Sequence, residues 1–360
     1  MTPKRNIRVL IVDDSASVRE TLVRIISDHP ALEVMGTAAD PFRASEILKR
    51  EKPDVITLDV EMPRMDGVTF LRRLMAQHPM PVVVCSSLVG DGTATLESVL
   101  AAGAVDIIQK PSLGVRDALL DQKIMIQNAV LGAAQARTER LGRGASHRSK
   151  ASADAVLPAP TGRAMAKTTE TVIAIGASTG GTDALRLVLE RLSPFSPPIV
   201  IVQHMPESFT AAFAKRLDSS CAITVKEAAN GDTLLRGQAL IAPGNRHMLL
   251  RRSGATYCVE VRDGPLVNRH RPSVDVLFRS VAQYAGPNAS GFILTGMGDD
   301  GAKGLLEMRN AGAHTFGQNE ESCVVYGMPA EAKKIGAVSR ELDLDGIANT
   351  INRIAGQSGG

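Results

Sequence analysis

The hydrophobic pattern of the chain alternates short apolar runs with stretches in which apolar residues recur every three or four positions. In the first third of the chain, these helical stretches separate apolar runs at residues 7–12, 55–58, 81–85 and 104–109. The alternation returns further on, with apolar runs at residues 171–175, 198–203 and 291–295. Short apolar runs bounded by turn residues are typical of strands buried in a parallel sheet with helices on both faces. We therefore predict two doubly wound parallel-sheet α/β domains.

The pattern fades between the two groups of strands. Residues 115–141 keep helical spacing, whereas residues 142–169 are rich in Gly, Ser, Ala and Pro with scattered Arg and Lys. Such a composition is typical of a flexible, semi-extended linker. A chain of 360 residues suits two domains. The predicted boundaries are a first domain at 1–125, a helix end and flexible linker at 126–169, and a second domain at 170–356.

Composition narrows the classes of partner. The net charge is only +3, aromatic residues make up 3% of the chain and Trp is absent. We therefore expect no nucleic-acid partner. No apolar run reaches the length needed to span a membrane, and we expect no direct membrane insertion and no signal peptide. The four cysteines stand apart, without C-x-x-C pairing, which favours reduced thiols and a cytoplasmic location.

Polar residues follow the apolar runs of the first domain. Asp13 and Asp14 follow the first run, Asp59 the second, Ser86 the third and Lys110 the fourth. Because the carboxyl ends of parallel strands meet at one edge of a sheet, we expect these side chains to converge. Carboxylates packed together repel one another unless a cation is present, and an all-oxygen site suits Mg²⁺. A lysine and a hydroxyl beside it would bind a phosphoryl group.

In these residues and their order, the first domain resembles the response-regulator receiver domain, which has a flavodoxin-like fold. The resemblance implies that Asp59 accepts a phosphoryl group from a histidine kinase and that Asp13, Asp14 and Asp59 hold Mg²⁺. It also implies that Ser86 and Lys110 contact the phosphoryl oxygens and that the bond from Lys110 to Pro111 is cis. Many receivers carry a switching aromatic residue three positions before the lysine, where this chain has Ile107.

The first apolar run of the second domain leads into Gly176-Ala177-Ser178-Thr179-Gly180, followed by a helical pattern from Thr182 to Leu192. The five residues fit G-x-S-x-G, the turn that exposes a serine hydroxyl above a sheet. Ser178 is therefore a candidate nucleophile. A packing turn and a phosphate-binding loop are the alternatives, and the second is weaker because neither G-K-[ST] nor G-x-G-x-x-G is present.

A base and an acid would have to come from later strand ends. His204 directly follows the next apolar run, and sequential strands are often neighbours, which places it within reach of Ser178. His247 and His270 are competitors, although the arginines beside them fit binding better than base catalysis. The apolar run at 291–295 ends in a glycine-rich turn with Asp299 and Asp300. Spacing alone does not choose between these two carboxylates, since either could instead cap the helix that follows.

The triad order Ser, His, Asp differs from the Ser, Asp, His order of α/β-hydrolases. The whole chain instead resembles the chemotaxis response-regulator protein-glutamate methylesterases. The motifs that carry the resemblance are at residues 175–181, 203–206, 268–275, 294–301 and 318–329. The family places its acid directly before the glycine that closes the turn, which selects Asp300. Asp299 is a departure, because relatives often carry Asn or Ala there.

The resemblance implies a phosphorylation-activated serine hydrolase that removes methyl esters from glutamates of methyl-accepting chemoreceptors and deamidates receptor glutamines. Methylated chemoreceptors and a chemotaxis histidine kinase would be its partners. Backbone N–H groups near Thr179 and Met297 would stabilise the oxyanion, and we expect no cofactor at the hydrolase site. The alternative is a non-catalytic phosphoreceiver adaptor, which treats the Ser178 turn as packing. A DNA-binding response regulator fits less well, because the second domain alternates strands and helices.

Overall fold

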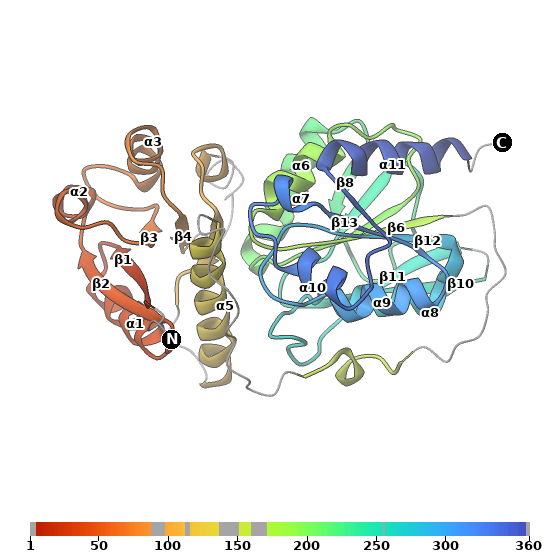
Figure 1. Ribbon diagram of the computed structural model, residues 1–360, viewed down its shortest axis with the longest axis horizontal. Helices are drawn as coiled ribbons and strands as arrows, with labels where there is room; N and C mark the ends of the chain where they lie inside the picture. Colours follow the sequence, from red (N-terminus) through yellow and green to blue (C-terminus); the bar gives the residue numbers. More distant parts are fainter. Residues whose placement is uncertain are drawn as a thin grey trace. The chain divides into compact units, whose positions relative to one another are not determined.

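The computed structural model describes residues 5–87, 98–111, 116–136, 151–159, 171–254 and 256–357. The chain divides into two compact units, Met1–Ser146 and His147–Gly360. Each unit contains a parallel sheet with helices on its faces (Figure 1). The predicted fold class is therefore confirmed.

The first unit is a five-stranded parallel sheet with the order β2-β1-β3-β4-β5, which is the flavodoxin-like order. Its strands are β1 (Ile7–Val12), β2 (Leu32–Ala38), β3 (Val55–Asp59), β4 (Val82–Ser86) and β5 (Asp106–Gln109). Its helices are α1 (Ala16–Ser27), α2 (Pro41–Arg50), α3 (Gly67–Gln77) and α5 (Arg116–Gln135). Helices α1 and α5 pack together on one face of the sheet, and α2 and α3 cover the other (Figure 1).

Strand β2 is absent from the predicted apolar runs. It lies at the edge of the sheet and pairs only with β1 among the described strands. Only its first and last residues, Leu32 and Ala38, are buried. An edge strand needs fewer apolar residues than a central one, which is why the pattern of apolar runs does not reveal it.

The second unit contains a seven-stranded parallel sheet with the order β14-β13-β12-β6-β7-β9-β8. These strands are β6 (Val172–Ala177), β7 (Ile199–Gln203), β8 (Thr224–Glu227), β9 (Gln238–Ile241), β12 (Ala289–Ile293), β13 (His314–Gln318) and β14 (Arg340–Leu342). An antiparallel hairpin joins β10 (His247–Ser253) to β11 (Thr256–Arg262). The sheet order places β6 between β7 and β12, so the candidate nucleophile follows a central strand.

Helices cover both faces of the second sheet (Figure 1). They are α6 (Gly181–Leu189), α7 (Glu207–Ser220), α8 (Val274–Tyr284), α9 (Ala302–Asn310), α10 (Met328–Lys334) and α11 (Leu344–Gln357). Helices α8, α9 and α10 pack on one face, whereas α6 and α11 pack together on the other. The amino end of α8 approaches β6 so closely that a Cβ on Gly176 would lie 2.2 Å from Val274 Cγ1. Only glycine fits at that point of the strand.

The structure differs from the sequence expectation in the linker. Residues 151–159 form a short 3₁₀ helix, η1 (Ala153–Ala155), with flanking turns. Ala153 and Leu157 are buried in an apolar cluster with Leu249, Val267 and Val276 of the second unit. We call residues 151–159 the anchor segment. Its composition resembles a linker, but Ala153 and Leu157 pack it against the domain.

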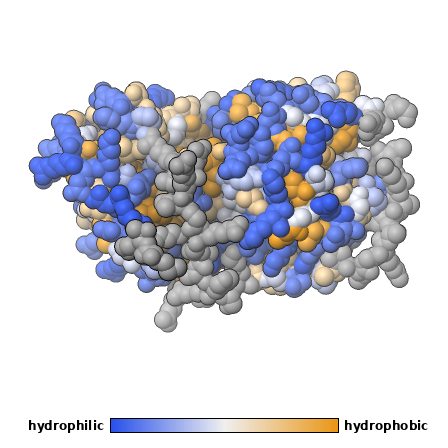
Figure 2. Space-filling model, in the orientation of Figure 1, coloured by the Kyte–Doolittle hydropathy of each residue, from blue (hydrophilic) through white to orange (hydrophobic). Residues whose placement is uncertain are grey.

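The described surface carries few large apolar side chains. The face visible in Figure 2 is largely hydrophilic, with smaller hydrophobic areas between. No helix in the described part of the chain is long and apolar enough to cross a membrane.

One local expectation is wrong. Within the described residues the cis peptide bond joins Arg271 to Pro272, and the bond from Lys110 to Pro111 is not cis. The Lys110 N–H donates to the carbonyl of Ser86 (2.9 Å). This bond continues the ladder between β4 and β5 and brings the lysine to the edge of the sheet.

Candidate active site and acidic site

The predicted acidic residues of the first unit meet at the carboxyl edge of its sheet. Strands β1 and β3 are paired up to the residues just before Asp13 and Asp59. Lys110 Nζ lies 2.7 Å from Asp59 Oδ2 and 3.3 Å from Asp13 Oδ2. Ser86 is buried at the end of β4, and Asp14 is exposed. The topology thus brings all the predicted residues of this site to one edge.

The acidic site fits a divalent cation. Asp13, Asp14 and Asp59 each offer one carboxylate oxygen, and these oxygens lie within 4.8 Å of one another. Asp13 Oδ2 is buried and, apart from its ion pair with Lys110, accepts no hydrogen bond from the described residues. Burial raises the pKa of the Asp13 and Asp59 carboxyls, and Lys110 opposes this effect only in part. A hard cation with oxygen ligands, such as Mg²⁺, would stabilise both ionised carboxylates.

Ser178 stands between a strand and a helix. Strand β6 ends at Ala177, and helix α6 begins at Gly181 after Gly180 has taken a left-handed φ of 77°. The Ser178 N–H donates to Thr295 O (3.0 Å), and Ser178 O accepts from Gly181 N (2.7 Å). These bonds fasten the turn to the end of β12 and to its own helix, which holds the serine at the carboxyl edge of the sheet.

His204 is the neighbour of Ser178 on the adjacent strand. The register of β6 and β7 pairs Ala177 with Gln203, and the His204 N–H donates to Ala177 O (3.1 Å). Parallel strands lie about 4.8 Å apart, so the residues that follow this pair stand side by side. Gln203 Nε2 donates to both Ser178 O (2.9 Å) and His204 O (3.1 Å). One buried amide therefore joins the backbones of the two residues.

Asp300, rather than Asp299, contacts the histidine. His204 Nε2 lies 2.8 Å from Asp300 Oδ2, and both side chains are buried. Although burial opposes ionisation, the hydrogen bond from His204 and the charges of His204 and His270 hold the pKa of Asp300 well below its usual range. An ionised carboxylate only accepts hydrogen bonds, so the hydrogen is on Nε2 of His204. Nδ1 of the ring is buried and accepts no hydrogen bond from the described residues.

Five hydrogen bonds from the described residues surround the Asp300 carboxylate. Two come from the backbone N–H groups of Val274 (2.7 Å) and Asp275 (3.2 Å), in the first turn of α8. The others come from Ser273 Oγ (2.7 Å), Asn268 Nδ2 (2.9 Å) and His204. The amino end of a helix favours a negative charge. This set of donors explains how a fully buried carboxylate stays ionised.

The two competing histidines have other surroundings. His247 is fully buried, its Nε2 lies 2.9 Å from Pro265 O, and its Nδ1 accepts from Ser273 N (3.3 Å). Burial lowers the pKa of His247, which keeps the ring neutral. His270 stacks on His204 with ring centroids 3.6 Å apart and an angle of 4° between planes. His204 is the histidine whose ring hydrogen bond to Asp300 is observed, through Nε2.

The candidate oxyanion residues lie on both sides of the serine. Thr179 directly follows Ser178 and is buried. Met297 is half-buried in the turn after β12. The preceding residue, Gly296, is so close that a Cβ there would lie 2.7 Å from Ser178 Cβ. Both residues are therefore next to the serine, in the turns of two neighbouring strands.

Comparisons with known proteins identify the family of the chain. Residues 173–351 match the CheB methylesterase family, and residues 9–121 match the response regulator receiver domain. A protein-glutamate methylesterase/protein-glutamine glutaminase of Geobacter metallireducens is 59% identical over 98% of this chain and 100% of its own length. One from Rhodospirillum rubrum is 60% identical over 97% of this chain and 98% of its own. The chain belongs to the CheB methylesterase family.

A solved CheB structure supports the same assignment. The CheB methylesterase catalytic domain of Thermotoga maritima is similar to 52% of this chain and to all of its own, with 34% identity and a TM-score of 0.50. In this CheB family member the receiver domain also indicates a phosphodonor kinase of a two-component system as a partner.

Sequence reasoning missed the residues that support Asp300. Asn268, Ser273 and Asp275 stand in a motif that carried the family resemblance, but none was assigned a role. Their signal was a run of polar residues directly before the helical pattern of α8, which is typical of a helix start. That pattern does not show which distant carboxylate the helix end contacts, because the contact depends on the packing of α8 against β6.

Proposed function

We propose that this CheB family member is a phosphorylation-controlled serine hydrolase that removes methyl esters from glutamates of chemotaxis receptors and deamidates receptor glutamines. The observation that carries the proposal is the hydrogen bond from His204 to a buried, ionised Asp300, on the strand end next to Ser178. The names of the relatives supply the substrate class. The non-catalytic adaptor explains neither the ionised buried carboxylate nor those names.

The chemistry follows from the protons at the three side chains. His204 Nδ1 takes the proton of Ser178 Oγ while Oγ bonds to the ester carbonyl carbon, and Asp300 stabilises the imidazolium that forms. The tetrahedral intermediate then loses methanol, which takes the proton from His204, and leaves an acyl-serine ester. Water attacks that ester with His204 again as the base, and the glutamate carboxylate is released. A glutamine amide follows the same path, with ammonia as the first product.

In this proposal the oxyanion lies between the turns of β6 and β12. Backbone N–H groups near Thr179 and Met297 would donate to it. Loss of one such donor typically costs about 3 kcal/mol of transition-state stabilisation.

The receiver domain would control the hydrolase through phosphorylation of Asp59. Asp13, Asp14 and Asp59 would hold a Mg²⁺ ion, which when bound neutralises charge on the incoming phosphoryl group. The Asp59 carboxylate attacks phosphorus and the donor leaves, while Lys110 and Ser86 bind the phosphoryl oxygens. The Lys110 ammonium, 2.7 Å from Asp59, is placed for that contact.

The proposed partners are methylated chemoreceptors and a chemotaxis histidine kinase. The proposed location is the cytoplasm, and all four cysteines are free thiols in the structure, as that compartment allows.

The test is methanol release from methylated receptor membranes by the full chain, with and without Mg²⁺ and a small-molecule phosphodonor. We expect phosphodonor to raise the rate and Ser178→Ala to abolish it, since loss of a catalytic serine costs about 10⁶-fold in a comparable enzyme. Ser219→Ala, an exposed serine at the end of α7, is the matched control and should leave the rate unchanged. Substantial turnover by Ser178→Ala would contradict the nucleophile. No release by the unaltered chain, with Asp59 still phosphorylated, would favour the adaptor.

A further inference from the structure

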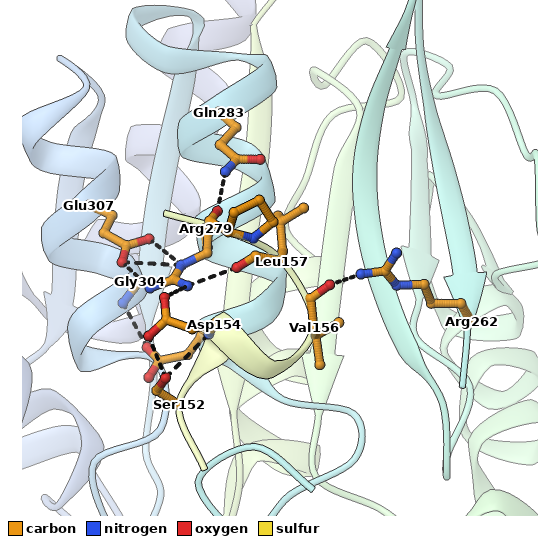
Figure 3. A network of polar contacts seen from close by, with 11 residues as sticks. Ser152, Asp154, Val156, Leu157, Arg262, Arg279, Gln283, Gly304 and Glu307 are labelled. Carbon is orange, nitrogen blue, oxygen red and sulfur yellow. Dashed lines mark hydrogen bonds and ion pairs between the residues drawn. The ribbon is translucent and has the colours of Figure 1, made fainter. Parts of the chain in front are cut away.

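The anchor segment is held to the second unit by polar contacts as well as by its apolar side chains (Figure 3). The Asp154 carboxylate lies 2.6 Å from Arg279 Nη1, and the same nitrogen donates to Leu157 O (2.9 Å). Gln283 Nε2 donates to Pro158 O, and Arg262 Nη2 donates to Val156 O. Helix α8 and strand β11 therefore bind the backbone of this part of the linker along its length.

Arg279 joins the anchor segment to helices α8 and α9 in a fixed geometry. Its guanidinium is buried on α8 and binds Glu307 of α9 through Nε (2.9 Å) and Nη2 (2.6 Å). The remaining nitrogen, Nη1, is the one that reaches the anchor segment. An arginine buried among two helices and a linker is a fixed fork of donors rather than a mobile surface charge.

The anchor segment also contacts the loop that supports the candidate triad. Val267 packs in the same apolar cluster as Ala153 and Leu157. The next residue, Asn268, donates its backbone N–H to Ala151 O (3.0 Å). Asn268 has a left-handed φ of 48°, so its backbone is held in a conformation that most residues avoid.

The side chain of Asn268 reaches into the site. Its Nδ2 donates to Asp300 Oδ1 (2.9 Å) and to Asp275 Oδ2 (2.5 Å). One amide thus bridges two buried carboxylates that would otherwise repel each other. His270, two residues further, stacks on His204. The loop therefore touches both the acid and the histidine of the candidate triad.

We propose that Asn268 is a positioning residue for Asp300 and that the linker anchor segment is the brace that holds Asn268 in place. The receiver is joined to the hydrolase through this segment, so the linker is part of the support of the catalytic centre. The proposal rests on the proposed function for its kinetic readout only.

The first arm compares two Asn→Gly variants of the full chain. Asn268→Gly removes the amide and keeps a backbone that tolerates positive φ. Asn245→Gly is the matched control, because Asn245 also has positive φ (59°), but its side chain bonds Arg271 and Glu207 instead of Asp300. We expect Asn268→Gly to lower kcat by about 10-fold to 100-fold, the usual effect of losing a group that orients a catalytic ligand, with KM nearly unchanged. Unaltered kcat would overturn the positioning role.

A spectroscopic readout is independent of activity. The hydrogen shared by His204 Nε2 and Asp300 should give a low-field proton resonance, assigned by its loss in His204→Gln. We expect Asn268→Gly to shift or broaden this resonance and Asn245→Gly to leave it in place. If the unaltered chain releases no methanol, the proposed function fails while this arm still tests the positioning. An unmoved resonance in Asn268→Gly would overturn it.

The second arm tests the brace. Leu157→Asp should release the anchor segment, and Leu235→Asp, at an exposed leucine of the same unit, is the matched control. We expect Leu157→Asp to lower kcat by about threefold to tenfold and to raise hydrogen exchange in residues 264–272. Leu157→Ala gives the same direction with a smaller effect if the charged variant does not fold.

A double variant shows whether the brace acts through Asn268. If it does, Leu157→Asp should add little to the loss in Asn268→Gly, because the loop has already lost its hold on Asp300. Losses that multiply, or exchange in 264–272 that stays the same in Leu157→Asp, would show that the anchor segment does not brace the loop.

Discussion

The two sheet edges of this protein treat buried carboxylates in opposite ways. At the receiver edge, Asp13 and Asp59 share one lysine, and burial leaves their pKa values raised. At the hydrolase edge, Asp300 is also buried but accepts five hydrogen bonds from the described residues, and its pKa is lowered. The carboxyl edge of a parallel sheet thus holds carboxylates with few hydrogen-bond donors in one domain and a carboxylate with many donors in the other.

The difference matches what each edge has to do. A site that binds a cation and a phosphoryl group benefits from carboxylates with free lone pairs, because incoming charges then complete the site. A triad acid keeps one charge state throughout, so its partners belong to the protein and are in place before substrate arrives. The backbone N–H groups at the amino end of α8 are part of that fixed environment. Because they belong to the backbone, no side chain loses conformational entropy to place them.

The largest expected effect is a loss of kcat when the charge of the Asp300 carboxylate is removed. Asp300→Asn should lower kcat for methanol release by about 10⁴-fold, as the corresponding change does in a serine protease triad. The amide would donate a hydrogen to His204 and favour the wrong tautomer. Steady-state methanol release measures it, with circular dichroism as the control for folding. A loss below about 10-fold would mean that Asp300 only supports the fold.

The second prediction concerns the acidic site of the receiver, and methanol release by the hydrolase domain is its readout. Removing Mg²⁺ with a chelator, or introducing Asp59→Asn, should abolish the phosphodonor-stimulated part of methanol release and leave the basal part. The reason is that the carboxylate cannot accept the phosphoryl group without its charge or without the cation that offsets it. If stimulation persisted in Asp59→Asn, the phosphoryl group would be on another residue.

The third effect concerns stability, where the two edges should respond with opposite sign. Asp13→Asn should stabilise the receiver at neutral pH without Mg²⁺, by about 1 kcal/mol as is typical of single substitutions, because it removes a carboxyl whose pKa folding raises. Asp300→Asn should destabilise the hydrolase, because it removes a carboxylate whose ionised form folding favours. Hydrogen exchange reports both domains separately in one full-length sample.

The stabilities of the two domains should also change with pH in opposite directions. The stabilisation from Asp300 is complete above the pKa of an unfolded aspartate and is lost as pH falls through its lower folded value. The stabilisation from protonated Asp13 and Asp59 is complete below the pKa of an unfolded aspartate. It is lost as pH rises through the raised pKa values of these groups in the folded protein. Asp66→Asn, which keeps the cap of α3, is the control and should change stability by less than about 0.5 kcal/mol. Equal pH dependences of the stability changes caused by Asp13→Asn and by Asp300→Asn would contradict the comparison.

The smallest expected change in kcat comes from a substitution next to the candidate triad. Asp299→Asn should change kcat by less than about twofold, because it keeps the size and shape of the side chain and His204 hydrogen-bonds Asp300. A pH–rate profile checks it. A shifted profile would show that the neighbouring charge reaches the imidazole.

The amino-acid pattern was enough to locate the residues that follow the buried strands. Ser178, His204, Asp59 and Lys110 could be predicted because strand ends are visible as ends of apolar runs, and parallel strands bring their ends together. Spacing left Asp299 and Asp300 open, and family resemblance chose between them. The structure agrees with that choice through the contact of Asp300 with His204.

The surroundings of those residues depend on how distant elements pack together. Edge strand β2, the hairpin of β10 and β11, and the anchor segment lack long apolar runs, because each needs only a few buried side chains. Besides His204, the donors to Asp300 come from Asn268, Ser273 and the first turn of α8, 25 to 32 residues away along the chain. Such contacts depend on how α8 packs against β6, and no local pattern of polar and apolar residues encodes that distance.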